Sequence, residues 1–290
     1  MKNILVTGGK GQLASCIKDV SGNLDNLNFI YVDIDQLDIT DIKSVKTFFK
    51  KNNVSYCINC AAYTAVDKAE SDKEFAEMVN VLGAKNLAIT CDSNDAVLIH
   101  ISTDFVFDGT HTKLYKEEDE ANPLSVYGLT KLNGELVIAD VLKKHIIIRT
   151  SWLYSEHGQN FLKTMMKLGS ERDSLGVVVD QIGTPTYAGD LAKAIVSIID
   201  KEKTSYGTYH YSNEGVASWY DFAKAIFDIS GINVDLSPIK TEAYPTPAVR
   251  PRYSVMDKSK IKQELKFNIP NWRDSLKICL TNLQNITHDL

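Results

Sequence analysis

The sequence has no apolar run that approaches the roughly 20 residues needed to span a bilayer, and it has no excess of basic residues. Its 32 Lys and Arg residues face 37 Asp and Glu residues, which gives a formal net charge of −5 and makes nucleic acid an unfavourable partner. A strand-like pattern starts as early as Asn3, so we expect no secretory leader. These absences predict a cytoplasmic protein that binds neither membranes nor nucleic acid.

Cysteine and histidine are scarce, with five and six residues. In a reducing compartment the cysteines are expected to be free thiols. Cys57 and Cys60 have the spacing of a redox pair or of half a zinc site, but residues 54–59 resemble a strand. The two side chains should then point to opposite faces, with Cα atoms roughly 10 Å apart, beyond the ~7 Å limit for a disulfide. No second C-x-x-C and no histidine pair at ligand spacing completes a zinc site, so no metal is assigned.

Short apolar runs alternate with helical patterns over the first half of the chain. The strand-like runs are 3–6, 29–33, 54–59, 96–102 and 145–151, and helical patterns separate them. Strands that are apolar throughout, alternating with amphipathic helices, predict an α/β protein with a Rossmann-type doubly wound parallel sheet. Beyond about residue 155 this rhythm loosens. We expect a nucleotide-binding domain over 1–155, with 186–211 returning to it, and a smaller C-terminal α/β substrate-binding domain over most of 156–290.

A glycine-rich turn joins the first strand to the first helix. Residues 9–14 fit G-x-G-x-x-G/A, and residues 8–14 fit the related G-x-x-G-x-x-G, with Ala14 as the small last residue of both. Glycines let backbone N–H groups approach a pyrophosphate at the positive end of the helix. Alone the motif is often only a turn, but here an acidic residue follows about 20 positions later, as dinucleotide sites require. The residues predicted to hold the cofactor in this turn are Gly8, Gly9, Lys10, Gly11, Gln12 and Leu13.

The cofactor preference is open. Asp33 would accept a hydrogen bond from the adenosine ribose and so favour NAD(H), whereas Lys10 would attract the 2′-phosphate of NADP(H). Asp38 and Ile39 are expected to pack against the adenine. The alternative for either aspartate is a cap or turn residue.

Tyr127 and Lys131 lie four residues apart in a helical pattern, so their side chains share one face. A lysine cation beside a phenol is expected to lower the tyrosine pKa and to suit the pair to acid–base work on a carbonyl and alcohol. Thr103 ends an upstream strand at the sheet edge where such proteins bind ligands. The Tyr-x-x-x-Lys spacing also occurs by chance in helices, and the combination carries the prediction.

The order of glycine turn, Thr103, Tyr127 and Lys131 resembles the extended short-chain dehydrogenases/reductases, and more closely the dTDP-4-dehydrorhamnose reductase family. The similar segments cover nearly the whole chain: TGGKGQL, NCAAYTAVDKAE, STDFVFDG, VYGLTKLNGE, RTSWLY, NFLKTM, DQIGTPT and AYPTPAVRP. The resemblance implies an NADPH- or NADH-dependent reduction of the C4 ketone of dTDP-4-dehydro-L-rhamnose, with Thr103, Tyr127 and Lys131 as the catalytic residues.

The resemblance also implies further site residues. Ala61, Ala62 and Tyr63 should run past the cofactor. The sugar nucleotide should meet Thr64, Val66, Thr103, Asp104, Phe105, Trp152, Asn160, Gln181 and Arg250, the last of these at a phosphate. Family members usually have tyrosine where this chain has Phe105. The alternative for Arg250 is pairing with a surface acid.

Some family members hold Mg²⁺ at a dimer interface through acidic residues, so the resemblance allows Mg²⁺ as a cofactor. Cys16 stands where a glutamate is expected. A metal-dependent dimer is therefore not expected, and a monomer or weak homodimer is predicted.

Two other functions stay open from the sequence. One is a non-catalytic NADP-binding regulatory subunit resembling the beta subunit of methionine adenosyltransferase. The other is a reductase of a different dTDP-4-keto-6-deoxy sugar.

Overall fold

A six-stranded parallel sheet forms the centre of the protein. The structure, a computed structural model, describes residues 1–22, 24 and 26–288. The strand order is β10-β5-β4-β3-β1-β2, and every neighbouring pair is parallel. The strands are β1 (Lys2–Thr7), β2 (Leu27–Tyr31), β3 (Val54–Asn59), β4 (Val97–Thr103), β5 (His145–Thr150) and β10 (Gly207–His210).

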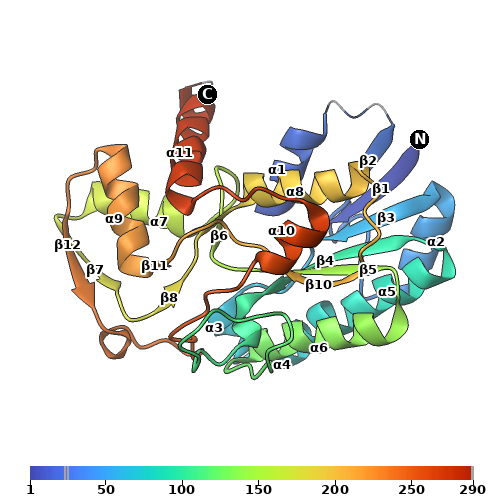
Figure 1. Ribbon diagram of the computed structural model, residues 1–290, viewed down its shortest axis with the longest axis horizontal. Coiled ribbons are helices and arrows are strands. Elements are labelled where there is room, and N and C mark those ends of the chain that lie inside the picture. The colour runs from blue at the N-terminus through green and yellow to red at the C-terminus, as the bar shows by residue number, and fades with distance from the viewer. Residues whose placement is uncertain (23, 25, 289–290) are drawn as a thin grey trace.

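Helices cover both faces of this sheet (Figure 1). On one face lie α1 (Gln12–Ser21) and α8 (Ala188–Asp200), which pack on Ile4 and Val6. On the other lie α2 (Ile42–Asn52), α5 (Ala84–Ser93) and α6 (Val126–Val141), which pack on Leu5. Because neighbouring residues of a strand face opposite sides, strands covered on both sides must be apolar throughout. The predicted doubly wound Rossmann-type sheet is confirmed.

The two cysteines of the C-x-x-C segment follow the same alternation. Cys57 belongs to the core under α2 and α5, whereas Cys60 packs against the core under α1 and α8. All five cysteines are free. The expectation that Cys57 and Cys60 are packing residues on opposite faces is confirmed.

A second group of elements packs beside the sheet around a core of its own (left side of Figure 1). Its helices are α7 (Phe161–Glu171), α9 (Trp219–Ser230) and α11 (Trp272–His288). Its short strands are β7 (Ser174–Val178), β8 (Ile182–Gly183), β11 (Ala217–Ser218) and β12 (Asp235–Ile239). Between the two parts run β6 (Leu153–Tyr154) and β9 (Thr186–Tyr187).

The late segments α8 and β10 are parts of the main layer, since α8 packs on α1 and β10 pairs with β5. The helix α10 (Ser259–Leu265) also contributes Ile261 and Leu265 to that core. The domain limits 1–155 and 156–290 stay a prediction. Among the described residues no helix combines the length and the apolar character that crossing a membrane would require.

A buried ion pair joins α6 to the sheet. Arg149 on β5 donates from Nη2 to Glu135 Oε2 at 2.7 Å and from Nε to Oε1 at 3.0 Å, and the side chains are 7% and 5% exposed. The hydroxyl of Ser102 on β4 donates to the same carboxylate. Buried charges are tolerated only when they are paired and hydrogen-bonded, so this contact fixes α6 against β4 and β5.

Replacing one partner of this pair should therefore be costly. Arg149→Met leaves Glu135 as an unpaired buried charge and is expected to lower the free energy of unfolding by about 3–5 kcal/mol. The matched control is Lys224→Met, which breaks the exposed Lys224–Asp228 pair and should cost less than about 0.5 kcal/mol. Urea unfolding measures both. Equal, small effects would show that the buried pair does not anchor α6.

Candidate active site

A cleft of about 840 Å³ opens at the carboxyl ends of the central strands. Thr7 ends β1, Thr103 ends β4 and Thr150 ends β5, and all three line it. It lies where the chain order reverses between β1 and β3, which is where open α/β sheets bind ligands. Its volume is in the range of small-molecule and cofactor sites.

The glycine turn presents a free helix N-terminus to this cleft. Gly8 has a positive φ of 63°, and a Cβ there would stand 2.8 Å from the Ala61 nitrogen, so only glycine lets β1 turn beside β3. Gly11 caps α1 without a side-chain hydrogen bond, and no acidic residue lies in the first turn. The unpaired N–H groups and the helix dipole suit a pyrophosphate. The chain therefore fits a dinucleotide at this point.

The acidic residues near the adenosine end also hold the local turns. Asp33 accepts from the backbone of Lys10 at 2.9 Å and of Ile34 at 2.8 Å, and Asp38 accepts from Thr40. The Lys10 ammonium pairs with Asp35 at 3.1 Å. Asp33, Asp38 and Ile39 line the cleft, but Lys10 does not.

Helix α6 brings Tyr127 to Thr103. Ser125 caps the helix by accepting from the Gly128 N–H at 3.1 Å. A Cβ on Gly128 would lie 2.2 Å from the carbonyl oxygen of Phe105, in the short helix η2 (Asp104–Val106). Only glycine allows this approach, which places Tyr127 beside the end of β4. The Thr103 side chain acts on the Tyr127 phenol and lowers its pKa, against the larger effect of burial.

Lys131 follows one turn later and is 2% exposed. Its ammonium donates to the Ile101 carbonyl at 2.6 Å and lies 3.3 Å from His100 Nε2. Burial lowers the lysine pKa to about 8, against the opposing influence of Glu135 and Cys60. The ammonium is thus held in place, and its pKa lies close to neutral pH.

The expectation that Lys131 lowers the Tyr127 pKa is wrong for this arrangement. Burial and, to a lesser extent, the Asp104 charge raise that pKa to about 12, and Thr103 opposes them. The ammonium is engaged with Ile101 and His100 instead. The phenol is therefore protonated at neutral pH, as a proton donor must be.

His100 is a residue that the sequence did not single out. It is buried on β4 between Lys131 and the Asn59 side chain, whose Nδ2 lies 3.0 Å from its Nδ1. Burial and the Lys131 charge keep its pKa well below the usual range. A neutral ring that carries its proton on Nδ1 can accept a hydrogen bond from Lys131 at Nε2, provided that the Asn59 amide turns its oxygen toward that proton, whereas a charged ring would repel the ammonium. The only sequence signal was a polar residue inside an apolar strand.

Asp104 is another group of the cleft whose pKa is shifted. Burial raises its pKa to about 6, although Ser254 and Thr103 favour the charged form. Its Oδ1 accepts from Thr103 at 3.2 Å, and its Oδ2 has no partner of bonding geometry among the described residues. This carboxyl group has unused hydrogen-bonding capacity beside Thr103 and Tyr127.

Asn80 holds the segment that follows β3. It lies in η1 (Met78–Gly83), a π-helical insertion that leads into α5, and such insertions often occur at functional sites. Its side chain accepts from the Tyr63 N–H at 2.9 Å and donates to Tyr63 O and to Thr130 on α6. Glu70 accepts from the Val126 N–H at 2.8 Å. The loop bearing Thr64 and Val66 is thereby tied to the helix of Tyr127.

Aromatic rings form the wall opposite this loop. Trp152 has a φ of 47°, which a bulky residue rarely adopts, and it stacks on Trp219 at a centroid distance of 3.6 Å. Phe161 also packs on Trp219, at a centroid distance of 4.6 Å. Gln181 does not line the main cleft; it accepts from Trp219 Nε1 at 3.2 Å and borders a small adjoining hollow.

Arg250 reaches the cleft while pairing with an acid. Its Nη1 and Nη2 contact the two Asp67 oxygens at 3.0 and 2.8 Å, which connects the C-terminal segment with the loop after β3. Asn160, by contrast, is absent from the lining of the cleft: it caps α7 and donates to Ser155 O at 2.7 Å. Asn160 thus holds the start of α7 and does not reach the cleft.

The structure brings most of the predicted residues to one cleft, and their roles there stay predictions. The predicted residues on its lining are Gly8, Gly11, Gln12, Leu13, Asp33, Asp38, Ile39, Ala61, Ala62, Tyr63, Thr64, Val66, Thr103, Asp104, Phe105, Tyr127, Lys131, Trp152 and Arg250. Those outside it are Gly9, Lys10, Asn160 and Gln181.

A doubly wound sheet whose glycine turn faces a Tyr-x-x-x-Lys helix defines a dinucleotide-binding protein of the short-chain dehydrogenase/reductase type. A family model described as the RmlD substrate binding domain matches residues 1–285. The chain belongs to this family, that of the dTDP-4-dehydrorhamnose reductases.

Similar proteins cover almost the whole chain. The dTDP-4-dehydrorhamnose reductase of Aggregatibacter actinomycetemcomitans is 41% identical over 96% of this chain and 98% of its own. A solved dTDP-4-dehydrorhamnose reductase from Clostridium acetobutylicum is 43% identical, with a TM-score of 0.94 over 97% of this chain and 99% of its own. One from Bacillus anthracis, solved in complex with NADP, is 37% identical, with the same TM-score over 97% and 100%.

The raised pKa of Asp104 predicts a pH-dependent stability. Its pKa is about 6 in the fold and near 3.8 ordinarily, so the folded state binds the proton more tightly, and stability falls as pH rises from 4 to 6. Asp104→Asn removes the charge and keeps an oxygen for Thr103. We expect it to raise the free energy of unfolding by up to about 3 kcal/mol at pH 7.5 and by little at pH 4.

Denaturant unfolding of both proteins at these two pH values measures the difference. An equal effect at both pH values would show that the Asp104 carboxyl is not held in an unfavourable environment.

Proposed function

We propose that this protein reduces the C4 ketone of dTDP-4-dehydro-L-rhamnose with NADPH or NADH and yields dTDP-L-rhamnose. The observation that carries the proposal is the convergence of Thr103, Tyr127 and Lys131 beside the glycine turn in one cleft. A relative 41% identical over nearly the whole chain bears the name of this reductase, which supports the same substrate.

Residues of this chain would bind each part of the cofactor. The open N-terminus of α1 would hold the pyrophosphate, and Asp33 would meet the adenosine ribose. Lys131 would donate to the hydroxyls of the second ribose, because its ammonium lies at the cleft and has two hydrogen-bond partners among the residues that the structure describes. The NADP complex of the Bacillus anthracis reductase supports NADPH as one cofactor.

The chain's own residues would handle the proton and the substrate oxygen. A bound reduced nicotinamide would supply the hydride to C4. Tyr127, protonated because of its raised pKa, would donate its Oη proton to the ketone oxygen as that oxygen becomes an alkoxide. The Thr103 hydroxyl would hydrogen-bond the same oxygen and fix it beside the phenol.

The remaining cleft suits a deoxy-sugar nucleotide. Phe105, Trp152 and Trp219 offer apolar faces for a sugar ring with a methyl group, and Phe105 meets Tyr127 edge to face at 5.7 Å. Arg250 is the cation for the diphosphate and would share its guanidinium between Asp67 and the ligand. We propose further that the protein acts in the cytoplasm as a monomer or weak homodimer.

Incubation with NADPH or NADH and dTDP-4-dehydro-L-rhamnose should oxidise the cofactor, and NMR should identify dTDP-L-rhamnose. A product with the other configuration at C4 would indicate a reductase of the alternative sugar type. The absence of turnover with either cofactor, while NADPH still binds, would contradict the reductase and favour the regulatory subunit.

Tyr127→Phe removes the donated proton and keeps the ring beside Phe105. We expect kcat to fall by 10²–10⁴-fold, with cofactor affinity changed less than about threefold. Tyr209→Phe is a control, since its phenol bonds Glu264 and the Ser205 carbonyl and does not line the cleft. If Tyr127→Phe retained near-normal kcat, another group would be the proton donor.

His100→Leu should test whether the imidazole positions Lys131. Loss of the acceptor at Nε2 leaves the ammonium with one partner, so we expect roughly tenfold losses in both kcat and cofactor affinity. His100→Gln supplies a replacement acceptor and should recover most of the activity. Equal losses in the two variants would assign His100 a packing role only.

A further inference from the structure

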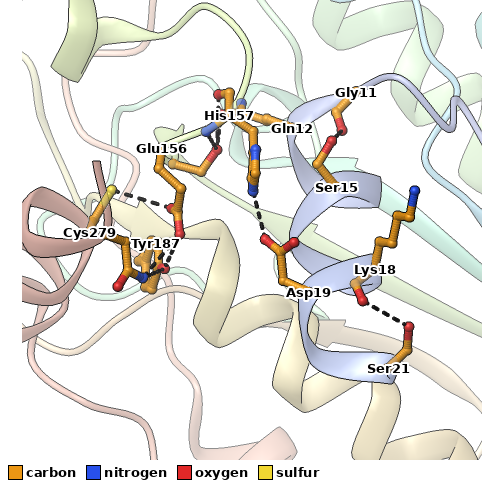
Figure 2. Close-up of polar contacts among 12 residues, drawn as sticks. Gly11, Gln12, Ser15, Lys18, Asp19, Ser21, Glu156, His157, Tyr187 and Cys279 are labelled. Carbon is orange, nitrogen blue, oxygen red and sulfur yellow. Dashed lines mark hydrogen bonds and ion pairs between the residues drawn. The ribbon is translucent and has the colours of Figure 1, made fainter. Parts of the chain in front are cut away.

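Three potential metal ligands, Cys16, Asp19 and His157, meet beside α1, and Figure 2 shows the side chains of Asp19 and His157 turned toward each other. Cys16 and Asp19 lie three residues apart on α1, and His157 comes from the loop after β6. Their ligand atoms all lie within 4.8 Å of one another. His157 Nε2 is 2.6 Å from Asp19 Oδ2. None of the three lines the cleft.

The donor set selects a particular class of cation. A thiolate, an imidazole and a carboxylate together favour Zn²⁺ and similar transition metals, whereas Mg²⁺ prefers oxygen ligands alone. In a tetrahedral zinc site, ligand atoms stand roughly 3.3–3.8 Å apart, since each is about 2.0–2.3 Å from the ion. To hold an ion between them, the His157 and Asp19 ligand atoms would move apart from 2.6 Å to roughly 3.3 Å.

The three ligands differ in solvent exposure, from the buried Cys16 to the exposed Asp19. Cys16 is 2% exposed, whereas the side chains of His157 and Asp19 are 27% and 53% exposed. An ion would enter past Asp19, keep solvent in its fourth position and contact the sulfur on its inner side.

A buried carboxylate lies behind the cluster and adds to its negative potential. Glu156 is 7% exposed and forms no ion pair among the described residues. Its oxygens accept from Tyr187 Oη at 2.9 Å and Asn282 Nδ2 at 3.1 Å, and Cys279 Sγ lies at 3.7 Å (Figure 2). Burial and the Glu156 charge raise the pKa of the Cys16 thiol to about 12, so a bound ion would have to displace the thiol proton. A buried carboxylate without a cationic partner is costly, and a nearby dication would offset that cost.

We propose that Cys16, Asp19 and His157 bind one Zn²⁺-type divalent ion within a single chain. The ion would clamp α1 to the loop at 155–158. Gln12, at the start of α1, already holds this segment by donating to Leu153 O at 3.2 Å and accepting from Ser155 Oγ at 3.3 Å. Leu153 and Phe161, on either side of the loop, line the cleft. The site is structural: it fixes the aromatic wall and takes no part in the reaction.

Co²⁺ titration of the chelator-treated protein tests the site, because cobalt bound to a thiolate absorbs in the near ultraviolet. We expect a 1:1 band that Zn²⁺ abolishes by displacement, and a higher thermal midpoint with Zn²⁺. Cys16→Ala should remove the band, and His157→Gln should weaken binding at least tenfold. The matched controls, Cys91→Ala and His145→Gln, change a buried thiol and a histidine elsewhere and should bind as the parent protein does.

The proposal fails if the parent protein gives no 1:1 band. It also fails if the band persists in Cys16→Ala or is lost equally in Cys91→Ala, since other thiols would then hold the cobalt. Asp19→Asn guards against misfolding, because the exposed side chain can change without loss of packing; unchanged affinity in this variant and in His157→Gln would overturn the ligand set. Mg²⁺ at the same concentration should leave the thermal midpoint unchanged, and an equal rise would contradict the thiolate–imidazole assignment.

Discussion

The close approach of α6 to the end of β4 is the constraint on which the candidate site depends. Gly128 permits it, since any Cβ would meet the Phe105 carbonyl. The buried pair of Glu135 and Arg149 then holds the same helix farther along its length. With both contacts in place, Tyr127 reaches Thr103 and Lys131 reaches the backbone of β4. The loop after β3 is fixed to this helix in turn through Asn80 and Glu70.

The ionisable groups of the cleft are held in environments that oppose their charged forms. Burial lowers the pKa of Lys131 and His100 and raises the pKa of Asp104 and Tyr127. At neutral pH the shifts of Lys131 and Asp104 cost stability, because both groups are charged in the unfolded chain, whereas Tyr127 and His100 are largely neutral in both states. Perturbed groups gathered in one cleft are typical of catalytic sites. Here they keep the phenol protonated and the imidazole neutral, which suits proton donation to a carbonyl oxygen.

Much of the fold and part of the candidate site could be predicted from the sequence, because both depend on local patterns of residues. Apolar strands alternating with helices gave the doubly wound sheet, and Thr103, Tyr127 and Lys131 followed from residue type and spacing. The electrostatics could not be predicted, since the Tyr127 pKa depends on burial by residues distant in the chain. His100, Asn80 and Trp219 were missed for the same reason. The cluster of Cys16, Asp19 and His157 spans 141 positions of chain, and only the fold brings its parts together.

The central claim is that this cleft directs a hydride to C4 of a dTDP-linked keto-sugar. The most direct test uses NADPH carrying deuterium at nicotinamide C4, with each prochiral label prepared separately, and NMR of the sugar product. The account predicts that one of the two labels places deuterium at sugar C4 and at no other sugar position. Deuterium at another carbon, or a product without deuterium from either label, would contradict it.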